Sequence, residues 1–269
     1  MATREMDLFS PLKTRFAEDG YLVLRQVLAP ETIQHVHAFL NSQMTDAIDA
    51  ACQQLGLASR DAFVEYANRA VKSSEIAGFD KLTRDVMTGH YPLEVRLSRE
   101  LWAIPRDAGL RNVLAALLES DTLFMHMPPT ARFVLPGNAQ AGVPAHQDAI
   151  YNEHMQGFIT VWVPFVTIDD RCGGVAVYPG SGSVKHAASH DQGNFWYDAA
   201  PTEGLEKLHV HCAPGDILVM NNHVIHESMP NVSDRTRVSV DLRFFGASGW
   251  SRKHYLDMQD WHVVAPTEA

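Results

Sequence analysis

The sequence predicts a mainly β fold with flanking helices, in which N-terminal α-helices pack on a double-stranded β-helix core of the jelly-roll, cupin-like kind. Two observations predict it. Up to about residue 120, apolar residues recur at the three- and four-residue spacing of helices. From Leu123 onward, short apolar or alternating runs are separated by glycine, proline, asparagine and aspartate, and turn pairs such as Gly173-Gly174 have the spacing of an antiparallel sandwich.

The first half of the chain contains the predicted helices. Apolar stripes with helical spacing lie at 33–40, after Pro30, and at 110–118. Residues 21–24 read as a short strand between helical segments. The segment at about 41–105 separates this strand from the β-rich half, so it is a candidate cover for the mouth of the core.

The second half contains the other predicted strands. They lie at Leu123–Met127, Arg132–Leu135, Gly157–Thr167, Gly174–Tyr178, Leu208–Cys212, Asp216–Met220 and Arg237–Phe245. No linker separates the halves, so we expect one domain over 1–269. Within it, 1–120 is the helical flank and covering segment, 121–250 is the β core, and 251–269 is a C-terminal tail.

Composition narrows the expected partners. With 22 Lys and Arg against 32 Asp and Glu, the formal net charge is -10, so nucleic acid and anionic lipid surfaces are not expected partners. The longest apolar run, 157–168, is interrupted by Pro164 and is too short to cross a bilayer. The N-terminus lacks the apolar stretch of a signal peptide, and three widely spaced cysteines form no CxxC pair. A cytoplasmic protein is therefore expected.

Histidine is abundant, with 14 residues, and it is the commonest metal ligand. On a strand, positions i and i+2 share a face, so His146 and Asp148 can direct an imidazole and a carboxylate at one point. His226, eighty residues later, can supply a third ligand. Two histidines and a carboxylate on one face of an octahedral metal leave positions open, which is the arrangement of non-heme Fe(II) oxygenases.

An arginine downstream supports this interpretation. Arg237 follows His226 by eleven residues and alternates with the apolar Val238, Val240 and Leu242 in a core-like strand. A buried arginine needs an anion, and its guanidinium offers a rigid fork that matches a carboxylate.

Together these motifs resemble the phytanoyl-CoA dioxygenase family of Fe(II)- and 2-oxoglutarate-dependent oxygenases. The resemblance covers roughly 123–245 and is carried by three segments: His146-Gln147-Asp148, Cys172–Ser181 and His226–Arg237. It implies a dioxygenase that consumes O2 and 2-oxoglutarate and releases succinate and CO2. It further implies hydroxylation of an unactivated C–H bond in a small metabolite or natural-product intermediate.

The resemblance also implies roles for individual residues. His146, Asp148 and His226 would bind iron and form the catalytic centre, and Ser228 and Arg237 would bind 2-oxoglutarate. Trp162 would lie beside the co-substrate. The chain departs from the family in two ways: Glu227 follows the distal histidine, where glycine is common, and the stretch upstream of His146 does not align, so Asn138 and Gln140 stay open as further contacts.

Other histidines and motifs fit less well. His223 is the rival third ligand, but it has neither serine two residues later nor arginine eleven residues later. His209 and His211 alternate on a predicted strand whose surroundings favour a structural role. A serine nucleophile in 180–184 lacks the final glycine of a nucleophile elbow. The remaining alternative is a zinc hydrolase, an isomerase or a binding module with the same ligands, which leaves Ser228 and Arg237 unexplained.

Substrate contacts are less defined. The covering segment carries polar and basic residues that could meet a carboxylate or phosphonate, although a solvated helix face is the favoured interpretation. They are Lys81, Arg84, His90, Tyr91, Arg96 and Arg99. Aromatic residues could instead frame an apolar or cationic ligand. They are Trp102, Phe195, Trp196 and Tyr197.

Overall fold

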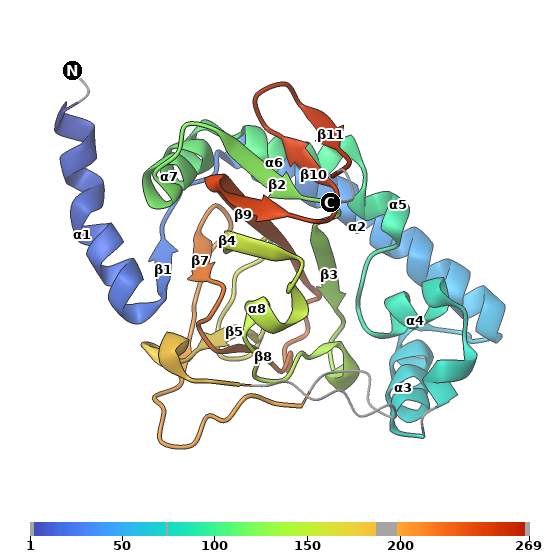
Figure 1. The fold of residues 1–269 in the computed structure, drawn as a ribbon. Helices are drawn as coiled ribbons and strands as arrows, with labels where there is room; N and C mark the ends of the chain where they lie inside the picture. Colours follow the sequence, from blue (N-terminus) through green and yellow to red (C-terminus); the bar gives the residue numbers. More distant parts are fainter. Residues whose placement is uncertain (1–2, 74, 187–197, 267–269) are drawn as a thin grey trace.

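The computed structural model describes residues 3–73, 75–186 and 198–266 (Figure 1). The α-helices are α1 (Thr3–Asp19), α2 (Pro30–Leu55), α3 (Arg60–Lys72), α4 (Lys81–Met87), α5 (Leu93–Arg96), α6 (Ala103–Arg106), α7 (Ala108–Leu118) and α8 (Asp148–Tyr151). Short 3-10 helices are η1 (Glu75–Gly78), η2 (Arg99–Trp102), η3 (Ala139–Ala141) and η4 (Ser181–Ser183). Nothing among the described helices is long and apolar enough to cross a membrane.

The strands form two antiparallel sheets. They are β1 (Tyr21–Leu24), β2 (Leu123–His126), β3 (Thr130–Val134), β4 (Met155–Pro164), β5 (Gly174–Val177), β6 (Leu208–His209), β7 (Ile217–Asn221), β8 (His226–Met229), β9 (Arg237–Ser251), β10 (Tyr255–Asp257) and β11 (His262–Val264). Within the described residues, the large sheet has the order β1-β7-β4-β9-β2-β10-β11, with β3 also paired to β9. The small sheet has the order β6-β5-β8. The described strands do not close into a barrel, and the predicted jelly-roll class with flanking helices is confirmed.

Helices cover one face of the large sheet. Val36 and Leu40 of α2 belong to the same buried apolar core as Val161 of β4 and Val240 of β9. Figure 1 shows α1 beside β1 at one side of the molecule and α3 and α4 at the other. Burial of this face fixes the register of the strands, because a slip of one residue would turn every apolar side chain to the opposite face.

The alternation of apolar and polar residues along β9 determines which side chains lie on the other face of the large sheet. Since Val238, Val240 and Leu242 point into the helical core, the residues that alternate with them must point toward the space between the sheets. These are Arg237, Ser239 and Asp241 in turn. The central strand therefore carries a row of polar side chains into the interior of the jelly roll.

Several elements differ from the expected ones. Asp148 opens α8 and does not lie on a strand with His146. The polar segment 226–229 forms β8 because it pairs with β5, although it has no apolar alternation of its own. The segment expected as a C-terminal tail contributes β10 and β11, and Leu256 is fully buried there. Three-residue strands of this kind carry too little pattern to be recognised from the sequence alone.

Candidate active site

Two histidines meet across a short backbone bridge. His146, just before α8, pairs with His226, the first residue of β8, through two backbone hydrogen bonds with N to O distances of 2.9 and 3.0 Å. Their ring centroids lie 4.3 Å apart. Asp148 follows at the start of α8, and one ligand atom from each of the three residues lies within 4.8 Å of the others. We call these three buried residues the buried cluster.

Each histidine of the buried cluster has a fixed orientation. Nδ1 of His146 lies 2.8 Å from the carbonyl oxygen of Pro144, and Nδ1 of His226 lies 3.2 Å from that of Val224. A carbonyl only accepts, so each Nδ1 carries the proton and leaves the Nε2 lone pair for another partner. Burial, with a smaller contribution from His226, lowers the pKa of His146 to about 3. His146 is therefore neutral, the form that binds a metal.

The carboxylate of the buried cluster is held from two sides. Nη2 of Arg243 donates to Oδ1 of Asp148 at 2.7 Å, and the hydroxyl of Thr160 donates to Oδ2 at 2.5 Å. The pairing of β4 with β9 sets Thr160 opposite Arg243. Burial alone would raise the pKa of Asp148, but the Arg243 guanidinium, with smaller contributions from His226 and His146, holds the pKa below its usual range. Asp148 is thus an ionised, oriented acceptor.

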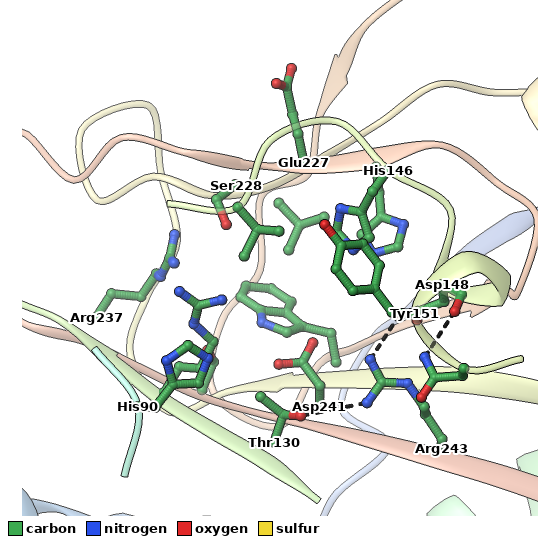
Figure 2. A pocket seen from close by; sticks show the side chains of 17 residues that line it. His90, Thr130, His146, Asp148, Tyr151, Glu227, Ser228, Arg237, Asp241 and Arg243 are labelled. Carbon is green, nitrogen blue, oxygen red and sulfur yellow. Dashed lines mark hydrogen bonds and ion pairs between the residues drawn. The ribbon is translucent and has the colours of Figure 1, made fainter. Parts of the chain in front are cut away.

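A cavity of about 260 Å³ between the sheets contains the buried cluster. It is lined by His90, Thr130, Arg132, Val143, His146, Asp148, Tyr151, Asn152, Trp162, Val175, His226, Glu227, Ser228, Arg237, Ser239, Asp241 and Arg243. All six site residues predicted from the sequence are in this set. Figure 2 shows Arg237 and Ser228 toward one end and His146 and Asp148 toward the other.

Arg237 lies at the end of the cavity away from the buried cluster. Its Nη1 donates to the carbonyl oxygens of Gly174 at 3.0 Å and Met229 at 3.3 Å. Its Nε is buried and has no partner among the described residues. Burial lowers the pKa of Arg237 to about 10, so it stays charged near neutral pH. A buried cation with an unsatisfied donor fits an anionic ligand.

The close packing around Arg237 depends on glycine. Gly173 has φ of +80°, and a Cβ there would lie 2.5 Å from the carbonyl oxygen of Met229. A side chain at this position would push β8 away from β5. Trp162, which is 2% exposed, lies on β4 opposite Asp241 and forms a wall of the same cavity.

The sequence interpretation missed the other polar residues of β9. Asp241 and Arg243 line the cavity together with Arg237 and Ser239, each two residues from the next. Burial raises the pKa of Asp241, and Arg243 opposes this shift. The signal was available: the polar positions that alternate with Val238, Val240 and Leu242 share one face.

Two open questions from the sequence have clear structural answers. Glu227 accepts a hydrogen bond from the Tyr178 hydroxyl at 2.7 Å and pairs with Lys207, and its carboxylate points away from the cavity in Figure 2. His223 is exposed, and its carbonyl oxygen accepts from the side chain of Gln147. His223 is therefore not part of the buried cluster, in agreement with the preference for His226.

The remaining candidates are structural or lie elsewhere. Asn138 donates to the carbonyl oxygen of Met87, and neither it nor Gln140 lines the cavity. Ser181 accepts from the backbone N–H of Ile225 at 2.8 Å, as a buried structural hydroxyl. Of the polar residues in the covering segment, His90 lines the cavity, whereas Lys81, Arg84, Tyr91, Arg96 and Arg99 do not. Trp102 packs with Arg99 and Arg106 outside it, and Phe195, Trp196 and Tyr197 lie outside the described residues.

Comparison with known proteins agrees with this geometry. The family model described as phytanoyl-CoA dioxygenase (PhyH) matches residues 16–239, which is most of the chain. The chain belongs to the phytanoyl-CoA dioxygenase family. Its members are oxidoreductases, and the match includes the buried cluster, Ser228 and Arg237.

Two similar proteins are named as hydroxylases. A 1-deoxypentalenic acid 11-beta-hydroxylase of Streptomyces exfoliatus is 32% identical over 144 residues, 48% of this chain and 51% of that protein. The chain thus matches about half the length of this relative. The enzyme of the same name from Streptomyces arenae is 26% identical over 247 residues, 87% of this chain and 80% of that protein.

Several solved structures share the fold of this chain. The epimerase SnoN, in complex with Fe3+, alpha ketoglutarate and nogalamycin RO, has a TM-score of 0.60 at 15% identity and covers 91% of this chain and 86% of its own. EctD from S. alaskensis, with 2-oxoglutarate and 5-hydroxyectoine, has a TM-score of 0.55 at 15% identity, over 89% and 76% of the two chains.

Proposed function

We propose that the protein is an Fe(II)- and 2-oxoglutarate-dependent dioxygenase that hydroxylates a C–H bond of a small metabolite or natural-product intermediate. The observation that carries the proposal is one cavity with two ends. A buried cluster of two histidines and an aspartate lies at one end, and a buried arginine with an unsatisfied Nε lies at the other. The named hydroxylase relatives and the 2-oxoglutarate complexes of similar folds support it.

The donor set fits iron. His146, Asp148 and His226 would hold Fe(II), because two imidazoles and one carboxylate with open positions suit non-heme iron. Both histidines have the proton on Nδ1, next to a backbone carbonyl, so both can bind through Nε2 without a change of tautomer. Bound iron with 2-oxoglutarate supplies oxygen activation, in which one atom of O2 enters the substrate and the other enters succinate as CO2 is released.

Other residues of the cavity would bind and orient the co-substrate. Arg237 and Ser228 would bind the carboxylate of 2-oxoglutarate that is remote from the metal, and Trp162 would pack beside its carbon chain. The charged Arg237 pairs with a carboxylate more strongly in this buried position than it would in water. The site lies between the two sheets, which would limit the access of water and with it unproductive oxidation.

A zinc hydrolase or a simple metal-binding module is the second candidate, because zinc accepts the same N and O donors. This candidate accounts for the buried cluster but does not explain the unsatisfied donor of Arg237. We further propose that the chain works as one oxygenase domain, with the covering segment contributing His90 to the cavity wall.

The test is anaerobic addition of Fe(II) and 2-oxoglutarate. The wild-type protein should develop a weak visible metal-to-ligand charge-transfer band, and His146→Ala should lose it. The matched control is His223→Ala, an exposed histidine three residues before His226, which should keep the band. Absence of the band in the wild type, together with tight zinc retention, would contradict the proposal. A substrate screen coupled to succinate release, read by product mass, would then identify the reaction.

A further inference from the structure

We propose that Asp170, His209 and His211 form a second divalent-metal site, on the surface of the small sheet. His209 ends β6, His211 follows two residues later, and Asp170 lies in the turn before β5. One ligand atom from each residue lies within 4.8 Å of the others. We call these three residues the surface cluster. Its His209 lies on β6, which is separated from β8 and His226 by β5.

The distances in the surface cluster suit chelation of one ion. Nε2 of His211 lies 2.9 Å from Oδ1 of Asp170, and Nδ1 of His209 lies 3.5 Å from the same oxygen. Two donor atoms, each about 2.1 Å from one zinc ion, are about 3.0 Å apart at a right angle and about 3.4 Å apart at the tetrahedral angle. The separations of the two histidines from Asp170 are therefore close to those that a shared ion requires, and the donor atoms of the two histidines lie within 4.8 Å of each other.

The tautomer of His209 points to a cation. Its Nε2 lies 2.7 Å from the carbonyl oxygen of Gly173, so Nε2 donates its proton there. The Nδ1 lone pair then faces the Asp170 carboxylate, and these two groups repel each other unless a cation or proton lies between them. Metal-binding histidines commonly have this second hydrogen bond to a backbone carbonyl, which fixes the ring. The side chain of His209 is only 16% exposed, so its ring is held in place.

The backbone presets the position of Asp170. The neighbouring Asp169 accepts from the N–H groups of Arg171 and Cys172 at 3.0 and 2.8 Å and also pairs with Arg235. Asp170 makes none of these turn contacts, and its side chain is 86% exposed. A backbone pair between Ile168 and Cys212, at 2.7 and 3.3 Å, fixes the turn beside the segment that carries His211.

The donors define the class of ion. Two imidazole nitrogens and one carboxylate oxygen suit Zn²⁺, Ni²⁺ or Cu²⁺, whereas Ca²⁺ and Mg²⁺ prefer oxygen alone. The nearby Cys212 is buried in an apolar cluster with Ile168 and Val210, and its thiol is not part of the surface cluster. A bound ion would tie the turn before β5 to the edge strand β6 and leave its remaining positions to water.

Zinc stoichiometry tests the proposal. The full chain, stripped of metal by a chelator, is titrated with Zn²⁺ by calorimetry. The wild type should bind two equivalents of zinc, one in each cluster. His211→Ala and His226→Ala should each bind one equivalent, and the double variant should bind none. The matched control is His262→Ala, which removes the single histidine of the acidic group Asp257, Asp260 and His262 and should leave two equivalents. Asp170→Asn, at an exposed position, should repeat the loss seen in His211→Ala.

The outcomes separate this proposal from the proposed function. One equivalent in the wild type and none in His226→Ala would overturn the second site and leave the oxygenase centre intact. Two equivalents retained in both His211→Ala and Asp170→Asn would also overturn it. A loss in His211→Ala without any loss in His226→Ala would instead support the second site and contradict metal binding by the buried cluster.

Discussion

The buried cluster and the surface cluster each consist of two histidines and one aspartate, in different surroundings. In both, histidine donates a ring N–H to a backbone carbonyl, as His146 does to Pro144 and His209 does to Gly173. The carboxylates differ. Asp148 is 2% exposed and is held by Arg243 and Thr160, whereas Asp170 is 86% exposed and contacts histidines. Ligand types alone therefore indicate metal binding and do not distinguish the two sites.

What distinguishes them is the space beside the metal donors. The buried cluster opens into a cavity of about 260 Å³ with Arg237 at its far end, and a ligand there is removed from water. In that setting a charged partner is worth several times more than at a surface. The surface cluster has no enclosed cavity among those described around it, so water would fill the open positions of an ion bound there.

Paired removal of the two carboxylates should give the largest contrast. Asp148→Ala removes a proposed iron ligand and with it several kcal/mol of transition-state stabilisation, or a roughly 1,000-fold or greater loss of turnover. Asp170→Ala changes an exposed side chain and should keep turnover within about twofold of the wild type. Succinate release under saturating Fe(II) and 2-oxoglutarate measures both. Equal losses in the two variants would show that the distinction between the clusters is mistaken.

Arg237 and Arg235 allow the same comparison of a buried with an exposed group for the binding of the 2-oxoglutarate carboxylate. Arg237→Ala should raise the KM for 2-oxoglutarate by about 10- to 100-fold, because a hydrogen bond to a charged group contributes about 1.5–3 kcal/mol. Metal loading should not change. Arg235→Ala is the matched control, since Arg235 pairs with Asp169 at an exposed position, where such pairs contribute about 0–1 kcal/mol.

Initial rates at varied 2-oxoglutarate and metal analysis of each variant separate the two possible roles of Arg237. Arg237→Lys, which keeps the charge but loses the fork, should recover part of the affinity. If iron loading collapses in Arg237→Ala while the 2-oxoglutarate dependence is unchanged, the assigned role is wrong and Arg237 supports the fold.

The sequence was sufficient where a residue had either a strong local pattern or a motif. All seven strands predicted in the second half are present, although β6 is shorter and β9 longer than expected, since apolar alternation reports which face is buried. The buried cluster was also predicted, although the local geometry was not: Asp148 begins a helix and reaches His146 through a turn. β8, by contrast, depends on pairing with a distant strand, and its polar sequence carries no pattern for it.

Arg243 shows the limit of reading a sequence from local patterns. Its partner Asp148 is 95 residues away, and the contact follows from the register of β4 against β9. The contact of His209 with Asp170 also depends on residues distant in the sequence, whereas the interpretation of His209 as structural used only its strand neighbours. The turn that brings Asp170 beside it is set by Asp169, 40 residues earlier in the chain. Long-range register of this kind is fixed by packing and not by local propensity.

Arg243 also gives the smallest and most specific expected effect. Arg243→Gln keeps a hydrogen-bond donor but removes the charge that holds the Asp148 carboxylate ionised in its buried position. Partners of metal ligands typically contribute 10- to 100-fold to metal affinity, and the Thr160 hydroxyl remains, so we expect a loss of about tenfold in Fe(II) affinity. Arg243→Lys should lose less. Anaerobic Fe(II) titration measures both variants, and zinc binding at the surface cluster provides an internal reference that neither substitution should alter. An unchanged Fe(II) affinity in Arg243→Gln would mean that Thr160 alone orients Asp148, and the contrast between the two carboxylates would then rest on burial and not on charge.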